Sequence, residues 1–243
     1  MARFFVDANE MQDDNIVLRG ENAAHAKVLR LKAGEHILVC DGNGNDCTCV
    51  VVSVSPSEVN THVIARQQST TEAAVKASIY LGFPKADKLE HVIQKATELG
   101  AYEIVAFPTA RCISKPDEKS LSKKIDRWQK IAFSAAEQCG RGLVPKIVIL
   151  PSYSDALMRA KEADKTILFY ENESATTLHM ALADCEYSSI SLITGPEGGF
   201  EVHEVSQAKE LGIQICTLGK RILRCETAPL CALSAVMYAS GEF

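Results

Sequence analysis

The sequence has no hydrophobic run long enough to cross a membrane. A membrane-spanning helix needs roughly 18 or more predominantly apolar residues, and polar or charged residues interrupt every apolar run before that length. The first residues, MARFFVDANEMQDDN, lack the basic start, apolar stretch and small-residue cleavage site of a signal peptide. We therefore expect a soluble, cytoplasmic protein that does not bind a membrane.

Metal-binding patterns are also lacking. The six histidines are dispersed and the nine cysteines form no CxxC pair, so we expect no metal site. Most of the cysteines lie inside apolar runs, such as residues 213–218. Their odd number and unpaired spacing predict reduced, buried thiols in a reducing compartment.

The composition that remains is that of an ordinary globular protein. Hydrophobic residues make up 47% and charged residues 23% of the 243 residues, which argues against disordered, collagen-like and coiled-coil classes. The net charge of -5 argues against nucleic-acid binding by the molecule as a whole. However, residues 74–150 carry 13 basic and 8 acidic residues, between two acidic segments. This part offers either a basic face to an anionic partner or a solvated helix face.

Up to about residue 70 the sequence predicts a small, mostly β barrel. The run at residues 41–46 (DGNGND) is turn chemistry for a hairpin. One short helix is expected around residues 23–29, and a polar linker follows from residue 67. The strand candidates are β-branched or alternating segments at residues 4–6, 16–18, 36–40, 48–54 and 59–65.

From residue 74 to residue 243 apolar strands alternate with amphipathic helices, which predicts a mainly parallel α/β sheet with helices on both faces. One helix is expected at residues 87–99, with Asp87 as its cap and Glu90 three residues on. Another is expected at about residues 121–139. Ligands of such sheets bind beyond the carboxyl ends of the strands. The strand candidates are residues 78–82, 104–107, 146–150, 166–170, 191–194 and 214–218.

Two glycine-bearing loops are the strongest candidates for a binding site. The fifth strand runs into a GPEGG loop at residues 195–199, whose three glycines let the backbone approach a ligand closely. The loop lacks the dinucleotide and P-loop patterns, and Glu197 would repel phosphate. The second loop runs from Leu218 to a helix expected to start with Thr227 as its cap. Although the GPEGG loop alone could be an ordinary turn, both loops together predict a cleft lined by backbone groups.

Several motifs resemble one family. RFF, HAKVLRLKAG, FPKADKLEHVIQKATELG, WQKIAFSAAEQCGRGLVP, GPEGGF and LGKRILRCETA resemble the RsmE family, 16S ribosomal RNA uracil-N3 methyltransferases of the SPOUT superfamily. The resemblance spans nearly the whole chain. It implies a PUA-like RNA-binding barrel over residues 1–70 and a SPOUT methyltransferase domain with a trefoil knot over residues 74–243. Cys139 and Cys225 stand where the family usually has Ser and Thr; both replacements are close in size, so we expect the fold and the cofactor site to survive.

The resemblance also implies an activity, a cofactor and partners. The activity is methylation of N3 of a specific uridine in 16S ribosomal RNA with S-adenosylmethionine as donor. The partners are 16S ribosomal RNA or the small ribosomal subunit and a second copy of the chain. Carried over motif by motif, the cofactor site comprises Thr194, Gly195, Pro196, Glu197, Gly198, Gly199, Leu218, Gly219, Ile222, Leu223 and Arg224.

Methylation of N3 requires that uracil lose its imide proton and that the resulting anion be stabilised. We expect Arg141 or Arg224 to stabilise the anion and Glu137 or Glu226 to accept the proton. For Glu137 and Arg141 a helix-end ion pair is the structural alternative. A covalent route through Cys139 or Cys225 is a rival that N3 alkylation does not need.

Phosphate contacts would supply affinity for RNA. The candidates are the basic residues of the middle segment and of the barrel, namely Arg3, Arg30, Lys32, Arg111, Lys115, Lys119, Lys123, Lys124, Arg127 and Lys130. Two other functions stay open. One is a related SPOUT methyltransferase acting on transfer RNA or on ribose 2′-hydroxyls. The other is a catalytically silent RNA-binding factor for ribosome assembly, against which the intact GPEGG and ILRCETA loops argue.

Overall fold

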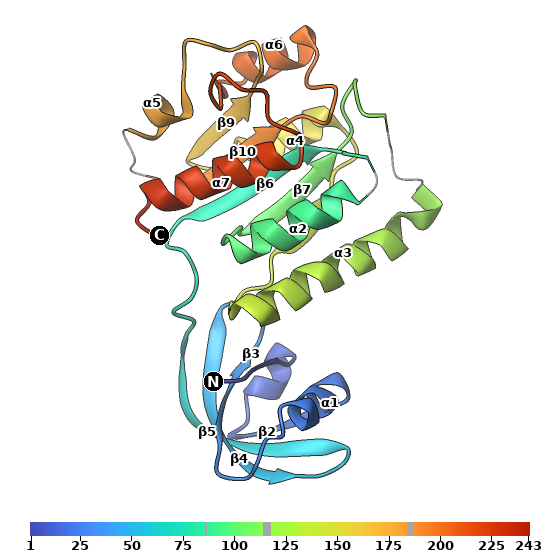
Figure 1. Cartoon of the computed structure of the whole chain (residues 1–243), viewed down its shortest axis with the longest axis vertical. Coiled ribbons are helices and arrows are strands. Elements are labelled where there is room, and N and C mark those ends of the chain that lie inside the picture. Colours follow the sequence, from blue (N-terminus) through green and yellow to red (C-terminus); the bar gives the residue numbers. More distant parts are fainter. Residues whose placement is uncertain (86, 114–117, 184–186) are drawn as a thin grey trace. The chain divides into compact units, whose positions relative to one another are not determined.

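The computed structural model describes residues 1–85, 87–113, 118–183 and 187–243, without the side chains of residues 118–120. The chain forms two compact units (Figure 1). The first comprises Met1–Glu72 together with Ala136–Val144, and the second comprises Ala73–Ala135 together with Pro145–Phe243. A segment of nine residues, Ala136–Val144, therefore returns to the first unit between the two parts of the second.

The first unit is a curled five-stranded sheet with the order β1-β3-β4-β5-β2. β1 is parallel to β3 and the other pairs are antiparallel, so the predicted strands, hairpin and short helix are confirmed. No described pairing joins the edge strands β1 and β2, and the expected barrel is therefore not closed by hydrogen bonds. The elements are β1 (Arg3–Phe5), η1 (Ala8–Met11), β2 (Asn15–Arg19), α1 (Glu21–Val28), β3 (His36–Cys40), β4 (Asn45–Val54) and β5 (Glu58–Gln68).

The hairpin between β3 and β4 is fixed by one side chain. Asp41 Oδ1 accepts hydrogen bonds from the backbone N–H groups of Asn43 (2.7 Å) and Asn45 (3.1 Å). This local bonding is the reason that Asp and Asn favour turns. Alternate residues of the strands, among them Ile37 and Val39, fill the core behind the turn, as the alternation of apolar residues predicts.

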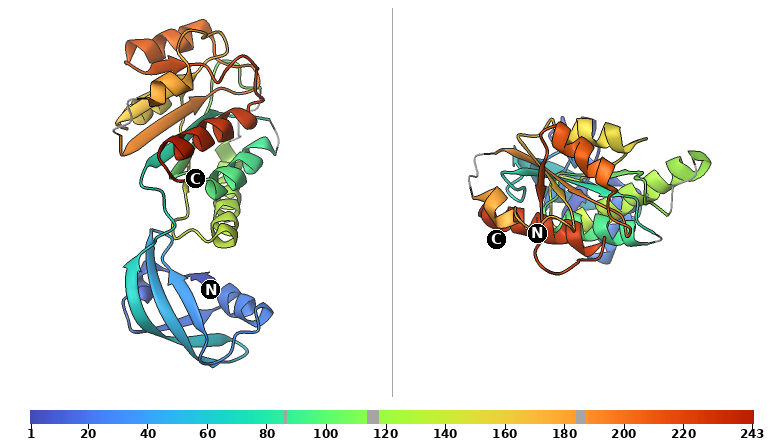
Figure 2. Two further views of the ribbon diagram at one scale, coloured as in Figure 1. Left: turned by 60° about the vertical axis from the view of Figure 1, so that its left-hand side comes forward. Right: turned by 90° about the horizontal axis from the view of Figure 1, so that it is seen from above.

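The second unit is a six-stranded sheet in which every pair is parallel, with the order β11-β9-β10-β6-β7-β8. This confirms the predicted α/β class. Figure 2 shows helices on both faces of the sheet. The elements are β6 (Lys76–Gly82), α2 (Lys88–Glu98), β7 (Glu103–Phe107), α3 (Glu118–Cys139), β8 (Lys146–Ile149), α4 (Tyr153–Ala160), β9 (Lys165–Phe169), α5 (Leu178–Leu182), β10 (Ser189–Thr194), α6 (Val202–Glu210), β11 (Gln214–Cys216) and α7 (Thr227–Ala239).

The two faces of this sheet are covered by different helices. Residues of α4 and α6 share one core cluster with residues of β6, β7, β9, β10 and β11, while α7 contacts β6, β10 and α2. No helix among the described residues is both long enough and apolar enough to span a membrane. Nor do the described residues contain a group of three His, Cys, Asp or Glu side chains placed to hold a metal ion.

Two predicted helix caps differ in part from the structure. Asp87 takes the N-cap position of α2 as predicted, but its side chain makes no capping hydrogen bond, and Glu90 instead forms an ion pair with Arg127 of α3, 2.7 Å between Oε2 and Nη2. α7 has Glu226 at its N-cap position, so Thr227 already lies inside the helix. In both cases contacts with distant residues compete with the local capping pattern.

The prediction of uniformly buried thiols was also wrong. Five cysteines are buried, but Cys139 and Cys231 are exposed and Cys112 is half-buried. Cys139 ends α3. Cys231 lies in α7, whose sequence TAPLCALSAVMYA is apolar on all sides, so no polar face marks which of its residues point to solvent. Cys185 lies outside the described residues.

Candidate functional site

A cavity of about 580 Å³ lies at the carboxyl ends of β9, β10 and β11, within the usual range for a small-molecule site of roughly 300–1,000 Å³. All eleven residues expected to bind the cofactor line it, so the structure brings the two glycine-bearing loops together. Nine further residues that the sequence analysis did not assign also line it: Phe169, Tyr170, Glu171, Phe200, Thr217, Lys220, Arg221, Cys225 and Ala228.

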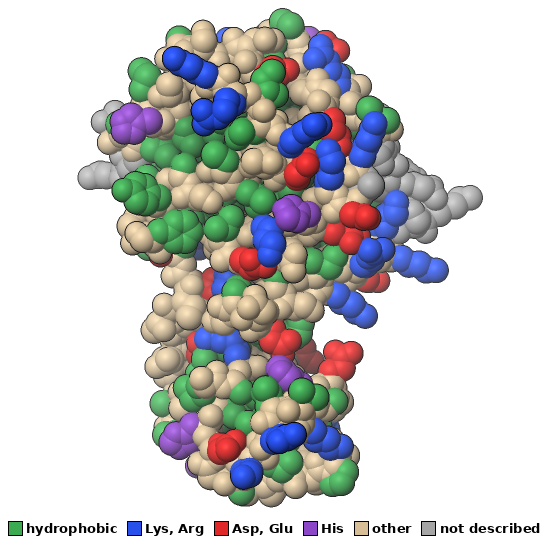
Figure 3. Space-filling view, in the orientation of Figure 1, with side chains coloured by type: hydrophobic (Ala, Val, Ile, Leu, Met, Phe, Trp, Pro, Cys, Tyr) green, Lys and Arg blue, Asp and Glu red, His purple; other side chains and the backbone are tan. Residues whose placement is uncertain are grey.

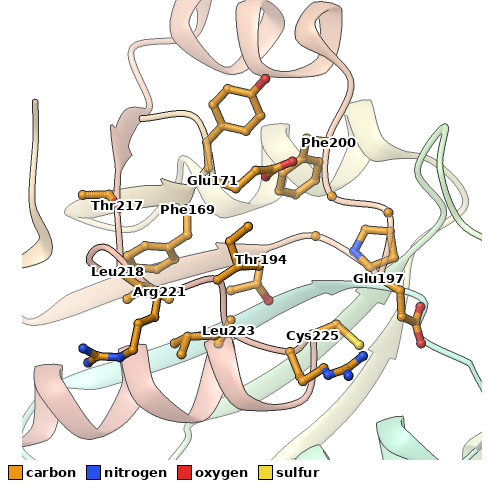
Figure 4. A pocket seen from close by; sticks show the side chains of 18 of the residues that line it. Phe169, Glu171, Thr194, Glu197, Phe200, Thr217, Leu218, Arg221, Leu223 and Cys225 are labelled. Carbon is orange, nitrogen blue, oxygen red and sulfur yellow. The ribbon is translucent and has the colours of Figure 1, made fainter. Parts of the chain in front are cut away.

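The residues at the end of β9 were not predicted to line the pocket, because their position there depends on the order of the strands in the sheet. The sequence predicts this strand, but not that it lies between β10 and β11. That position places Phe169, Tyr170 and Glu171 between the two loops. The polar Glu171 directly after an apolar strand was the one signal available. In Figure 4, Glu197 and Cys225 lie toward one end of the pocket and Thr217 and Arg221 toward the other.

Two glycines permit the close approach of the pocket walls. A Cβ atom on Gly82, the last residue of β6, would lie 2.5 Å from Pro196 Cδ and 2.9 Å from Pro196 N. Gly199 has a φ of +67°, and a Cβ there would overlap the carboxylate of Glu171. Since only glycine fits at both positions, the GPEGG loop packs directly against its neighbours.

Charged groups gather next to Cys225. Lys88 Nζ, at the start of α2, lies 3.2 Å from Glu197 Oε1 and 3.1 Å from Glu226 Oε2. Partial burial opposes ionisation of Glu197, but the N–H group of Lys85 and the ammonium of Lys88 hold its pKa below the usual value. Hydrogen bonds from its own N–H group, from Cys225 and from Lys88 likewise lower the pKa of Glu226. Both side chains are therefore carboxylates at neutral pH.

The Cys225 thiol stays protonated in this environment. Burial and its hydrogen bond to Glu226 Oε2 (3.2 Å) raise the pKa of Cys225 to about 12. Because the thiolate is the nucleophilic form of cysteine, this environment disfavours a covalent route through Cys225.

The four residues expected to take part in catalysis divide between the two units. In the second unit, Arg224 lines the pocket and Glu226 is bonded to the pocket-lining Cys225. The other two belong to the first unit. Arg141 is 5% exposed and pairs with Glu72, 2.6 Å between Nη2 and Oε2. Glu137 Oε1 lies 3.0 Å from His25 Nδ1. Arg141 and Glu137 therefore each have a structural partner, which is the kind of role that the sequence analysis gave as the alternative to catalysis.

Among the residues expected to contact RNA, three pair with acidic side chains: Arg3, Arg111 and Arg127, the last of which bonds to Glu90 but stays 66% exposed. Arg3 pairs with the buried Asp46 at 3.0 Å. Arg111 pairs with Glu201 at 2.8 Å and donates to the carbonyl of Gly198, so it braces the GPEGG loop.

Arg127 and the remaining candidates for RNA contacts are mostly exposed. Basic side chains stand along the edge of the second unit that carries α3 (Figure 3). Lys115 and the side chain of Lys119 lie outside the described residues. The exposed candidates are Lys123, Lys124, Arg127 and Lys130 on α3, and Arg30 and Lys32 in the first unit.

Comparison with known proteins gives the class that this fold and pocket define. Residues 71–237 match the model of an RNA methyltransferase domain, and residues 18–64 match that of an RNA methyltransferase PUA domain. The protein is thus an RNA methyltransferase by class, with the pocket inside the methyltransferase domain.

Similar proteins narrow the class to one family. The chain is 38% identical to ribosomal RNA small subunit methyltransferase E of Bacillus subtilis, over 98% of this chain and 96% of that protein. It is 34% identical to the protein of that name from Mesomycoplasma hyopneumoniae, over 96% and 98%. The crystal structure of the Neisseria gonorrhoeae protein, bound to S-adenosylmethionine, has a TM-score of 0.83 at 30% identity and covers 98% of this chain and 97% of that one. This chain belongs to the ribosomal RNA small subunit methyltransferase E family.

Proposed function

We propose that this protein methylates N3 of a specific uridine in the 16S ribosomal RNA of the small subunit, with S-adenosylmethionine as donor. The observation that carries the proposal is the pocket at the carboxyl ends of β9, β10 and β11, whose lining includes all eleven residues expected to bind the cofactor. The family supports it, because the relative from N. gonorrhoeae binds S-adenosylmethionine.

The residues present fit this cofactor. Four glycines of the two loops, Gly195, Gly198, Gly199 and Gly219, line the pocket, so backbone groups there can pair with an adenine edge, and Phe169 and Leu223 supply apolar surface. Glu197 is a carboxylate at neutral pH, which suits a cationic donor and disfavours a phosphate-bearing one. When bound, the cofactor supplies an electrophilic methyl group on a positively charged sulfur.

The chain's own side chains supply the remaining chemistry. Glu226 is ionised at neutral pH and can accept the imide proton. Arg224 lines the pocket and can stabilise negative charge on the uracil oxygens. Glu137 and Arg141 remain second candidates for these two roles, and each must then act from its pair with His25 or Glu72. The proposal includes no covalent adduct with Cys225.

RNA binding is assigned to the exposed cations of α3 and to Arg30 and Lys32. Neutralising Lys123, Lys124 and Arg127 together should weaken RNA binding and flatten its dependence on salt, because fewer counterions are then released. An unchanged slope would refute this placement. The homodimer and the trefoil knot implied by the family, and the cytoplasmic location expected from the sequence, belong to the same proposal, and light scattering of the purified protein tests the dimer.

One assay separates the proposed function from its rivals. Labelled donor is supplied with naked 16S RNA, with small subunits and with transfer RNA, each from a strain lacking the enzyme, and the nucleosides are then analysed. We expect labelled 3-methyluridine. Label in a 2′-O-methylated nucleoside, or transfer only to transfer RNA, would assign a related activity instead. If no labelled methyl group reaches the RNA in all of these mixtures, the ribosome-assembly factor becomes the better interpretation.

A further inference from the structure

One side chain of α2 joins the two loops that form the pocket. Glu197 belongs to the loop after β10, and Glu226 ends the loop after β11. Lys88 Nζ lies within 3.2 Å of a carboxylate oxygen of each, and 3.6 Å from Cys225 Sγ. A single ammonium group therefore links three segments that are far apart in the sequence.

The linked carboxylates are held by other groups as well. Glu197 Oε1 accepts a hydrogen bond from the N–H group of Lys85 (3.0 Å), and Glu226 Oε2 accepts one from Cys225 (3.2 Å). The side chain of Lys88 is 30% exposed, and those of the two glutamates are 22% and 27% exposed. Exposed, isolated ion pairs contribute little. A half-buried cation shared by two fixed carboxylates can instead hold its partners in one arrangement.

A second lysine of the same helix provides the contrast. Lys95 pairs with Glu98 one turn away, at 2.8 Å. This pair joins two residues of α2 and no loop, so its loss leaves the pocket unchanged. The two lysines have similar exposure, 30% and 39%, and differ chiefly in what they connect.

The charges explain why the linking group must be a cation. Glu197 and Glu226 approach the same ammonium, so without it two carboxylates would face each other across the gap between the loops. Like charges in one site raise the pKa of at least one partner. The groups facing Glu226 are Lys88, Cys225 and, across the ammonium, Glu197. Hydrogen bonds to Glu226 and Glu197 raise the pKa of Lys88, so it stays charged.

We propose that Lys88 is a positioning residue of the methyl-transfer site, which fixes the GPEGG loop against the start of α7 and keeps Glu226 in place as a proton acceptor. This inference rests on the proposed function. Lys88 does not itself contact the reacting atoms in this scheme. Lys88 instead keeps the GPEGG loop in place against the start of α7 and keeps the Glu226 carboxylate ionised.

The test compares Lys88→Met with Lys88→Arg and with the matched control Lys95→Met. In calorimetric titrations with S-adenosylmethionine, Lys88→Met should bind about tenfold more weakly, which corresponds to roughly 1.4 kcal/mol. Lys95→Met should stay within twofold of the wild type. Lys88→Arg keeps the cation and should recover most of the affinity.

The pH dependence of kcat/KM gives a readout that a purely structural role would not change. In the wild type the pKa of Glu226 lies below its ordinary value, so the carboxylate is ionised at neutral pH and is lost only as the pH falls through the lowered pKa. In Lys88→Met the two unscreened carboxylates should move the acid limb to higher pH, while Lys88→Arg keeps it in place.

Coupling to Glu197 keeps the inference testable if Lys88→Met folds poorly. Glu197→Gln breaks the same link from the other side and should also weaken donor binding. The double variant should lose less than the sum of the two single losses, since they remove one interaction. Wild-type affinity and an unchanged pH profile in Lys88→Met, or full additivity in the double variant, would overturn the role of Lys88. A wild-type protein that binds no donor would instead overturn the proposed function.

Discussion

Two ion pairs of the first unit differ in burial from the pairs of Lys88 in the second. The Arg3 and Asp46 side chains are 9% and 2% exposed, and those of Arg141 and Glu72 are 6% and 19% exposed, although other pairs of the first unit, such as Arg19 with Glu58, lie at the surface. In the second unit the pairs of Lys88 stand at the edge of a pocket and keep about a quarter of their surface in contact with solvent. Buried pairs hold an architecture because breaking them strands a charge. Pairs at a pocket edge can respond to a ligand.

The largest effect that separates the two units is expected from Arg141→Ala. Removing this guanidinium leaves the carboxylate of Glu72 without its cation, which should lower the free energy of unfolding by about 3 kcal/mol. Urea denaturation measures the loss. If Arg141 rather than Arg224 stabilises the uracil anion, the same variant should also abolish methylation; in either case S-adenosylmethionine affinity should stay near that of the wild type because the pocket lies in the second unit. Full methylation by Arg141→Ala would exclude this residue from the chemistry.

A smaller effect, confined to the second unit, is expected from Gly82→Ala. The new Cβ would press on Pro196 and displace the GPEGG loop, at a cost of about 2 kcal/mol. Calorimetry should show weaker donor binding. Gly212→Ala is the control: its φ is +79° with no atom near the added Cβ, so it should lower stability without changing donor affinity. Equal donor affinities in both variants would contradict the close packing described for the pocket.

Arg30→Gly tests a position of the first unit at which backbone strain and the proposed RNA contact fall on the same residue. Arg30 has a φ of +56°, just after α1. Its N–H group bonds to the carbonyl of Lys27, and that of Leu31 to the carbonyl of Ala26, a helix ending that favours glycine. Thermal unfolding should show a gain of about 1 kcal/mol, while filter binding should show weaker RNA affinity.

Lys32→Ala separates the two effects of Arg30→Gly. It removes a neighbouring cation without relieving any backbone strain, so it should weaken RNA binding with no gain in stability. If Arg30→Gly keeps full RNA affinity, Arg30 does not contact RNA. If it is no more stable than the wild type, the αL position carries no strain.

The smallest effect is expected from Cys225→Ser. The wild-type thiol is protonated and serves as a hydrogen-bond donor to Glu226, a role that a hydroxyl can fill. Activity should therefore change by less than about threefold, or about 0.6 kcal/mol. In the wild type, alkylation at pH 8 should reach the exposed Cys139 and Cys231 first and spare Cys225, whose pKa is about 12. A covalent adduct with 5-fluorouridine RNA, seen by mass spectrometry, would contradict this description.

Local patterns in the sequence predicted the elements well. Alternating and β-branched runs predicted the eleven strands found among the described residues, and the apolar stripe of α2, including Val92 and Ile93, is buried as its spacing requires. The glycines of residues 195–199 indicated the pocket because glycine, which has no Cβ, lets the backbone approach a ligand closely.

Non-local features could not be predicted in the same way. The order of strands places Glu171 in the pocket, and no short pattern encodes that order. The partner of Arg3 lies 43 residues away, so a surface role was an equally good interpretation of its charge. The helix that contains Lys88 could be predicted from its apolar periodicity. The contacts of Lys88 could not, because Glu197 and Glu226 lie in loops more than 100 residues later in the chain.

The return of residues 136–144 to the first unit has a consequence for synthesis. A nascent chain that ends at residue 72 holds all five strands of the first sheet. It lacks Arg141, which pairs with Glu72, and it lacks the N–H groups of Gly142 and Leu143, which donate to the same carboxylate. The first unit is therefore completed only after two strands of the second unit, β6 and β7, have been synthesised. A gene fragment encoding the first 72 residues alone omits that closing segment, whereas a fusion that joins residues 1–72 to residues 136–144 restores it.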